Sequence, residues 1–204
     1  MSAVTFPLLG IARLRMGSDG EGVTSLVAGA GCPLRCEWCI NKKALREAPA
    51  QNVTAKELLE RVKADDLYYR ATGGGITFGG GESLLHADFI REFRGTCPPE
   101  WKITAETSLF VPRNYLAAVT DAVDLFVVDC KDMNGEIYRK YTGEDVSVMK
   151  ENLAFLLSRK GCEQVLVRVP LIPEYNTAQD QKRSAEELRS MGVKRLDLFE
   201  YVIK

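Results

Sequence analysis

Short runs of apolar, β-branched residues alternate along the chain with segments whose apolar residues recur at helical spacing. Six runs have the length and composition of strands: 23–29, 75–78, 102–107, 124–131, 164–173 and 195–203. Six segments have a helical pattern: 54–70, 84–94, 113–123, 134–142, 147–160 and 177–191. Thr54 and Glu57 form a capping box at the start of the first of these helices.

The alternation of strands and helices predicts parallel strands joined by right-handed crossovers, in a doubly wound sheet or a barrel. A complete eight-fold barrel takes about 250 residues, whereas this chain has 204. We therefore expect an α/β fold, an incomplete (β/α)6 TIM-type barrel with mostly parallel strands. A single domain over residues 1–204 would hold a short N-terminal β segment (1–22) and a core (23–204). Ligands of such folds bind at the carboxyl ends of the strands.

Composition and charge limit the partners of this chain. It carries 27 basic and 28 acidic side chains, a net charge of −1, without the basic excess typical of nucleic-acid binding. It has no apolar run near the roughly 20 residues that a membrane helix needs. Its N-terminus lacks the features of a signal peptide. We expect a cytosolic protein that binds neither nucleic acid nor membrane. In a reducing compartment, clustered cysteines are metal ligands or catalytic groups more often than disulfides.

Clustered cysteines follow the first predicted strand: Cys32, Cys36 and Cys39. A structural zinc site takes four Cys or His ligands, but the chain has one histidine, His86, and no second Cys-x-x-Cys pair. A redox site would use only "CEWC" and leave Cys32 unexplained. A four-iron cluster on three thiolates keeps one iron open to an outside ligand, and the downstream pattern favours this interpretation. The scattered cysteines, which we expect to be buried or incidental, are Cys97, Cys130 and Cys162.

Glycines and charged residues stand at the ends of the later strands. The glycine-rich turn "GGGE" after the second strand lets the backbone approach a ligand closely, with a bare turn as the alternative. It is not a P-loop, because no Lys-Ser/Thr follows, and it does not fit the dinucleotide-binding spacing. Asp129 and Lys131 close the fourth strand, and charged groups are rarely buried without partners. Arg168 lies inside the apolar run "VLVRVPL" and needs an anion, which a carboxylate can supply bidentately.

The motif C-x3-C-x2-C, with Trp38 before its last cysteine, resembles the signature of the radical S-adenosylmethionine (SAM) superfamily. "SDGEG…GCPLRCEWCIN" and "GGGITFGGGESLL" look like the corresponding parts of the glycyl-radical-enzyme activating enzymes. "DLFVVDCKDMNGEIYRKYTG" and "VRVPLIPEYN" are similar to their later strands. The resemblance covers roughly residues 18–203.

The resemblance implies two cofactors: a [4Fe-4S] cluster on the three clustered cysteines, and SAM bound to the open iron through its amino and carboxylate groups. One electron entering the sulfonium would cleave a carbon–sulfur bond and give methionine and a 5′-deoxyadenosyl radical. That radical would take hydrogen from a glycine Cα of a partner glycyl radical enzyme, with a flavodoxin or ferredoxin as electron donor. The alternatives are a minimal enzyme that modifies a ribosomal peptide or small molecule, and a metal-binding interaction protein without catalysis.

The resemblance also assigns SAM-binding residues: Trp38, Asn41, Gly79, Gly80, Gly81, Glu82, Glu106, Thr107, Asp129, Lys131 and Arg168. The glycine backbone would meet the SAM amino group, Glu106 would pair with this ammonium, and Arg168 with the SAM carboxylate. Lys131 would contact SAM while Asp129 holds a cation or its neighbours, and Trp38 would pack near the adenine. The alternatives are a solvated strand end, internal salt bridges and core packing.

Four positions depart from the family pattern. Ser83 stands where proline often continues the Gly-Gly-Glu motif, and Leu109 stands where a glycine is frequent. Glu21 and Thr24 replace the proline and arginine that are common in the N-terminal motif. These departures bear on the identity of the substrate more than on the SAM chemistry.

Overall fold

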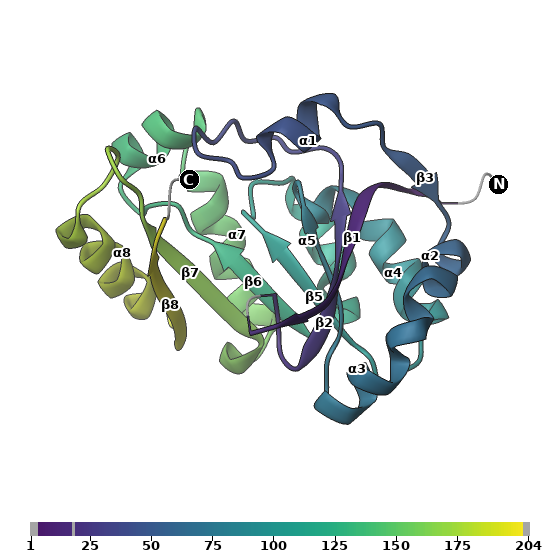
Figure 1. The fold of residues 1–204 in the computed structure, drawn as a ribbon. Helices are drawn as coiled ribbons and strands as arrows, with labels where there is room; N and C mark the ends of the chain where they lie inside the picture. Colours follow the sequence, from purple (N-terminus) through teal and green to yellow (C-terminus); the bar gives the residue numbers. More distant parts are fainter. Residues whose placement is uncertain (1–3, 18, 202–204) are drawn as a thin grey trace.

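Eight strands form one sheet in the computed structural model, which describes residues 4–17 and 19–201 (Figure 1). The strands are β1 (Phe6–Met16), β2 (Val23–Gly29), β3 (Gln51–Val53), β4 (Gly75–Gly80), β5 (Lys102–Thr107), β6 (Leu125–Asp129), β7 (Val165–Leu171) and β8 (Arg195–Glu200). The helices are α1 (Lys42–Glu47), α2 (Ala55–Val62), α3 (Asp66–Thr72), α4 (Ala87–Thr96), α5 (Arg113–Val119), α6 (Gly135–Thr142), α7 (Ser147–Arg159) and α8 (Ala178–Ser190).

The predicted strands are all present and run parallel. β2, β4, β5, β6, β7 and β8 are neighbours in that order. β1 and β3 extend the sheet beyond β2 with antiparallel pairing. The sheet order starts at β3 and ends at β8, and these two edges do not pair within the described residues, so the sheet stays open. The expected fold, an incomplete barrel of six parallel β/α units, is confirmed.

Two elements are not predicted by the hydrophobic pattern. β3 has 3 residues, too few to show an alternation. α1 buries none of its residues, so it has no apolar stripe; it lies in the segment that crosses the upper end of the sheet in Figure 1. The N-terminal β segment is the strand β1, which pairs with β2 from Leu8–Gly29 to Met16–Val23. Among the described helices, none has both the length and the hydropathy required for a membrane span.

The parallel strands pack against α2 and α4, and buried apolar side chains fill the space between them. Phe78 of β4 makes edge-to-face contacts with Phe6, Phe89 and Phe93, at centroid distances of 5.7, 6.2 and 5.6 Å, an arrangement that aromatic pairs prefer. The capping box at the start of α2 is confirmed, since Thr54 N donates to Glu57 Oε2 at 2.8 Å. Packing of this kind holds the strands so that their carboxyl ends meet at one edge.

Away from that edge, polar side chains tie distant segments together. Glu21, just before β2, accepts from Lys102 Nζ at 2.6 Å and from Arg195 Nη1 at 3.0 Å, at the amino-terminal ends of β5 and β8. The Arg13 guanidinium donates to the buried Asp65 carboxylate at 2.7 and 2.5 Å. We call this set the support network: Arg13, Glu21, Ser25, Asp65, Tyr69, Lys102 and Arg195.

Candidate active site

A cavity of about 680 Å³ opens at the carboxyl ends of the parallel strands. It is lined by residues that the resemblance assigns: Cys32, Cys36, Trp38, Cys39, Asn41, Gly80, Gly81, Glu82, Glu106, Thr107, Asp129, Lys131 and Arg168. Of the assigned residues, only Gly79 is absent from the lining. These residues meet because parallel strands present their carboxyl ends at the same edge of a sheet.

The cysteine loop (residues 30–41) follows β2 and lies against the end of α6. The backbone N–H of Arg35 donates to the carbonyl oxygen of Thr142 at 3.0 Å. The backbone N–H of Glu37 donates to the carbonyl oxygen of Tyr141 at 3.1 Å. Backbone hydrogen bonds from a second element therefore set the position of the loop, although it contains no helix or strand of its own.

The thiols of the cysteine loop share the cavity without forming a finished ligand set. Cys32 is exposed, Cys36 and Cys39 are half-buried, and all three are free. No three His, Cys, Asp or Glu side chains in residues 4–17 and 19–201 are grouped so as to hold a metal ion. Burial raises the pKa of Cys36, and that of Cys32 to about 11, so iron must displace protons to bind. His86 Nε2 lies 2.9 Å from the Ala30 carbonyl oxygen, so the one histidine of the chain already has a partner.

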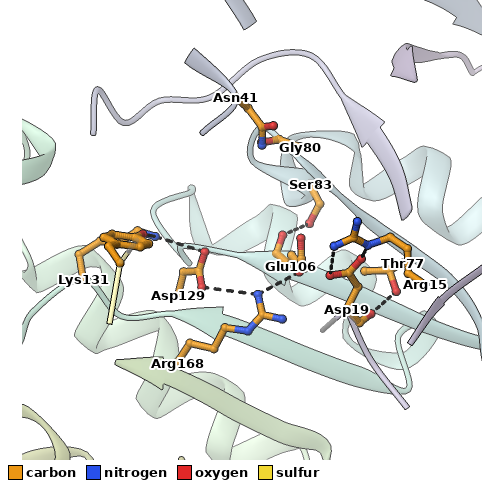
Figure 2. Close-up of polar contacts among 11 residues, drawn as sticks. Arg15, Asp19, Asn41, Thr77, Gly80, Ser83, Glu106, Asp129, Lys131 and Arg168 are labelled. Atoms are coloured by element: carbon orange, nitrogen blue, oxygen red, sulfur yellow. Dashed lines mark hydrogen bonds and ion pairs between the residues drawn. The ribbon is translucent and has the colours of Figure 1, made fainter. Parts of the chain in front are cut away.

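The glycine turn after β4 presents backbone to the cavity. A Cβ atom at Gly79 would lie 2.6 Å from Glu106 Oε2, so a side chain there would displace that carboxylate. Gly80 has φ +90°, a conformation that L side chains rarely adopt. Asn41 Nδ2 donates to the Gly80 carbonyl oxygen at 2.7 Å (Figure 2). Asn41 thus joins the cysteine loop to the glycine turn.

Glu82 braces the ends of β4 and β5. Its buried carboxylate accepts from Thr107 Oγ1 at 2.6 Å, from Ser108 Oγ at 2.6 Å and from Ser108 N at 2.8 Å. It also accepts from Leu84 N at 3.2 Å. Burial raises the pKa of Glu82, and the donors from Ser108 and Thr107 oppose that shift. Sequence analysis does not assign Ser108, although its place directly after Glu106 and Thr107 is a signal that could have found it.

Charges of alternating sign run along the cavity (Figure 2). Lys131 Nζ lies 3.2 Å from Asp129 Oδ2, and Arg168 Nη1 lies 4.0 Å from Asp129 Oδ1 and 3.0 Å from Glu106 Oε1. Burial raises the pKa of Glu106, against the effect of Arg168. Burial alone would lower the pKa of Lys131, but Asp129 helps to hold it well above its ordinary value. An amino-acid zwitterion finds partners for both of its charges here, and the glycine backbone and three sulfur ligands suit a cluster beside it.

Other residues line the cavity without a motif that marks them: Arg15, Gly17, Asp19, Leu26, Leu34, Ile40, Ser108, Tyr141, Asp197, Phe199 and Tyr201. Arg15 of β1 forms an ion pair with Asp19 of the connection from β1 to β2, and Thr77 Oγ1 donates to the Asp19 carbonyl oxygen (Figure 2). Besides Ser108, the last strand carried a usable signal: Asp197 and Phe199 lie at alternate positions of β8, and side chains at alternate positions of a strand point to the same face.

A family model and two named relatives match this chain. Residues 26–185 match the family model of the Radical SAM superfamily. Pyruvate formate-lyase 1-activating enzyme of Escherichia coli K12 is 29% identical over 188 residues, which cover 90% of this chain and 76% of that protein. (2S)-3-sulfopropanediol dehydratase activating enzyme of Klebsiella oxytoca is 26% identical over 220 residues, which cover 78% of this chain and 69% of that protein.

A solved structure shares the fold. The crystal structure of Streptococcus suis SuiB bound to S-adenosylmethionine aligns with 85% of this chain at a TM-score of 0.64 and 12% identity. The present chain spans 39% of SuiB. At this level of identity the likeness concerns the fold alone.

Proposed function

Because the chain belongs to the radical SAM superfamily, whose enzymes use a [4Fe-4S] cluster and SAM, we propose that it activates a glycyl radical enzyme. The substrate in this proposal is a glycine Cα of that partner. The products are 5′-deoxyadenosine, methionine and a glycyl radical on the partner.

The observation that carries the proposal is the shared lining of one cavity by three cysteine thiols, a glycine backbone turn and charges of alternating sign. A sulfonium amino acid bound to an iron needs all three features together. The iron needs sulfur ligands. The amino acid needs a backbone that it can approach closely, and partners for its ammonium and carboxylate groups.

Each group of residues has its own task. Cys32, Cys36 and Cys39 would hold the cluster, and the chemistry it would supply is one-electron reductive cleavage of the carbon–sulfur bond of SAM. Arg168, which pairs with Glu106 at 3.0 Å, would also hold the SAM carboxylate, and Glu106 would hold the SAM ammonium. The oppositely charged neighbours keep these side chains in place while the cavity is filled.

The partner is inferred from the relatives and from the open sheet. The two relatives are named as activating enzymes of pyruvate formate-lyase and of a sulfopropanediol dehydratase. The sheet edges β3 and β8 do not pair with each other within the described residues, and a barrel that stays open would admit a peptide loop of a macromolecule. A single-electron donor, a flavodoxin or ferredoxin, supplies one electron for each hydrogen atom moved from the glycine Cα to the 5′ carbon.

The test is electron paramagnetic resonance of a candidate glycyl radical enzyme after anaerobic incubation with the cluster-loaded protein, SAM and reduced flavodoxin. We expect a glycyl radical signal on the partner. A partner whose radical glycine is replaced by alanine serves as the control and should stay silent. Turnover of a short peptide or small molecule with no radical on any intact partner would contradict the activase proposal and favour a minimal modifying enzyme.

A further inference from the structure

Three buried side-chain donors have no hydrogen-bond partner among the described residues. They are Trp38 Nε1, Tyr138 Oη and Tyr141 Oη. Native proteins pair nearly all buried polar atoms, so an unpaired group calls for an explanation. Trp38 and Tyr141 line the cavity, whereas Tyr138 does not. The donors of Trp38 and Tyr141 therefore stand where a ligand in the cavity could supply the missing acceptor.

Tyr141 and Trp38 belong to the same side of the cavity. Tyr141 lies near the end of α6, and its carbonyl oxygen accepts from the backbone N–H of Glu37, one residue before Trp38, at 3.1 Å. The Tyr141 side chain is buried, and its ring packs against the rings of Tyr175 and Tyr201 at centroid distances of 5.0 and 6.5 Å. These contacts hold the ring in place and thereby set the position of the hydroxyl.

The lining of the cavity changes from charged to aromatic along one line of contacts. Ion pairs link Glu106 to Arg168 and Arg168 to Asp129 (Figure 2). Lys131 Nζ lies 3.2 Å from both Asp129 Oδ2 and Tyr201 Oη, so it stands between the charges and the aromatic rings. The aromatic side of the cavity, as we define it, consists of Trp38, Tyr141, Phe199 and Tyr201.

SAM has the same two-part character as this lining. Its amino-acid half carries charges, whereas its nucleoside half is uncharged and contains the flat adenine ring. Ring nitrogens of adenine accept hydrogen bonds, and the indole N–H and the tyrosine hydroxyl are both able to donate. Aromatic side chains also pack well against another flat ring. The aromatic side therefore offers the donors and the apolar contact that adenine needs.

We propose that Tyr141 binds the nucleoside half of SAM and that its hydroxyl donates a hydrogen bond to a ring nitrogen of the adenine. This inference rests on the SAM binding in the proposed function, and it adds a binding residue that no sequence motif marks. The charged side would hold the amino-acid half. Separate sets of side chains would thus bind the two halves of the ligand, and loss of the Tyr141 hydroxyl would affect the nucleoside half alone.

The test compares Tyr141→Phe with the wild type by anaerobic titration calorimetry of the cluster-loaded protein. The cluster is left unreduced, so that SAM stays intact. One ligand is SAM. The other is S-methylmethionine, which has the same ammonium, carboxylate and sulfonium groups but a methyl group in place of the nucleoside. We expect the Kd of SAM to rise about tenfold, because one hydrogen bond is lost and its acceptor is left unpaired. The Kd of S-methylmethionine should not change.

Tyr175→Phe is the matched control, because its ring contacts that of Tyr141 but the residue is not part of the cavity lining. It should bind both ligands like the wild type. Arg168→Ala should weaken the binding of both, since both carry a carboxylate. Urea unfolding of the cluster-free proteins gives a second readout. Tyr141→Phe removes an unpaired hydroxyl and should be no less stable than the wild type.

Equal affinities of the wild type and Tyr141→Phe for SAM would overturn the inference. An equal loss of affinity for S-methylmethionine would also overturn it, because the hydroxyl would then serve the amino-acid half. So would a lower unfolding midpoint for Tyr141→Phe, since the hydroxyl would then have a partner inside the fold. If the wild type binds SAM but forms no glycyl radical on any partner, the activase proposal fails while this inference stands, and the two failures are thereby distinguished.

Discussion

The support network and the cavity both bury polar side chains, yet only the support network gives every buried donor a partner. Asp65 accepts from Arg13 at 2.5 Å and from Ser25 at 3.4 Å, and Tyr69 donates to Ser25. At the cavity, Trp38 and Tyr141 have buried donors without partners among the described residues. The paired donors of the support network stabilise the fold, whereas the unpaired donors at the cavity can still bind a ligand.

Because the two regions have no residue in common, we expect stability and ligand binding to be separable in this molecule. None of the support-network residues lines the cavity. Substitutions in the support network should therefore change the free energy of unfolding and spare ligand binding. Substitutions in the cavity should do the reverse.

Cys36→Ala should have the largest effect on the cavity. We expect loss of cluster assembly and of SAM cleavage, because two thiolates hold a four-iron cluster poorly. The free energy of unfolding of the cluster-free protein should hardly change. Iron content and visible absorption after anaerobic reconstitution measure the effect.

Cys97→Ala is the control, since this thiol lies outside the cavity and accepts from Arg94 Nη2 at 3.3 Å. It should keep its iron. Retention of iron and SAM cleavage in Cys36→Ala would show that the motif is not the ligand set, and metal loss in Cys97→Ala would revive a four-ligand zinc site.

Arg168→Ala should weaken SAM binding by about 2–5 kcal/mol, because it removes one partner of a largely buried charge pair. The cluster should remain. Anaerobic titration calorimetry of the cluster-loaded protein measures the affinity. Arg183→Ala, an arginine on α8 whose side chain is 70% exposed, is the control and should bind SAM like the wild type. An unchanged affinity for SAM in Arg168→Ala would mean that Arg168 serves only in its internal ion pair with Glu106.

Asp65→Asn tests the role of the support network in stability. The carboxylate is 1% exposed and accepts from Arg13, Ser25 and Tyr69, so its loss should cost about 2 kcal/mol of unfolding free energy. Urea denaturation of the cluster-free protein measures this. An equal loss of SAM affinity in the cluster-loaded variant would show that the two regions are coupled.

The effect of Asp65 should depend on pH. The hydrogen bond from Arg13 holds the pKa of Asp65 below its ordinary value. Its contribution is therefore full above the unfolded pKa of about 3.9 and is lost as the pH falls through the lower folded pKa. The difference between wild type and Asp65→Asn should stay constant above about pH 5 and shrink in more acidic urea titrations.

Glu21→Gln should have the smallest effect. Its carboxylate pairs with Lys102 and Arg195, but the side chain is 43% exposed, and water screens such pairs. We expect a loss of about 0.5–1 kcal/mol of unfolding free energy, which high salt should reduce. A loss that salt leaves unchanged would mean that geometry rather than charge is responsible.

Much of the fold follows from the sequence because its signals are local. The runs 23–29 and 102–107 agree with β2 and β5, and Thr54 caps α2 as expected. Once the strands are predicted, their carboxyl ends are predicted as well. The charged side chains that meet at the cavity lie at these ends. Their roles toward SAM and iron stay predictions.

Three departures from the family pattern receive a physical account. Ser83 Oγ donates to the Glu106 carbonyl oxygen at 2.7 Å, a bond that proline could not make. Leu109 has φ 57°, the left-handed conformation that explains a preference for glycine there. Glu21 joins two strands through Lys102 and Arg195.

The remainder depends on contacts between distant segments, which no local pattern encodes. Nothing near Tyr138 in the sequence shows that its hydroxyl is buried without a partner. The sequence likewise gives no sign that Arg15 pairs with Asp19 inside the cavity. Such groups become visible only when the hydrogen bonds of the folded chain are accounted for one by one.

The most direct test of the central claim is an anaerobic SAM-cleavage assay with the reduced, reconstituted protein. The account predicts a brown protein that converts SAM to methionine and 5′-deoxyadenosine. A colourless, zinc-loaded protein that leaves SAM intact would contradict it.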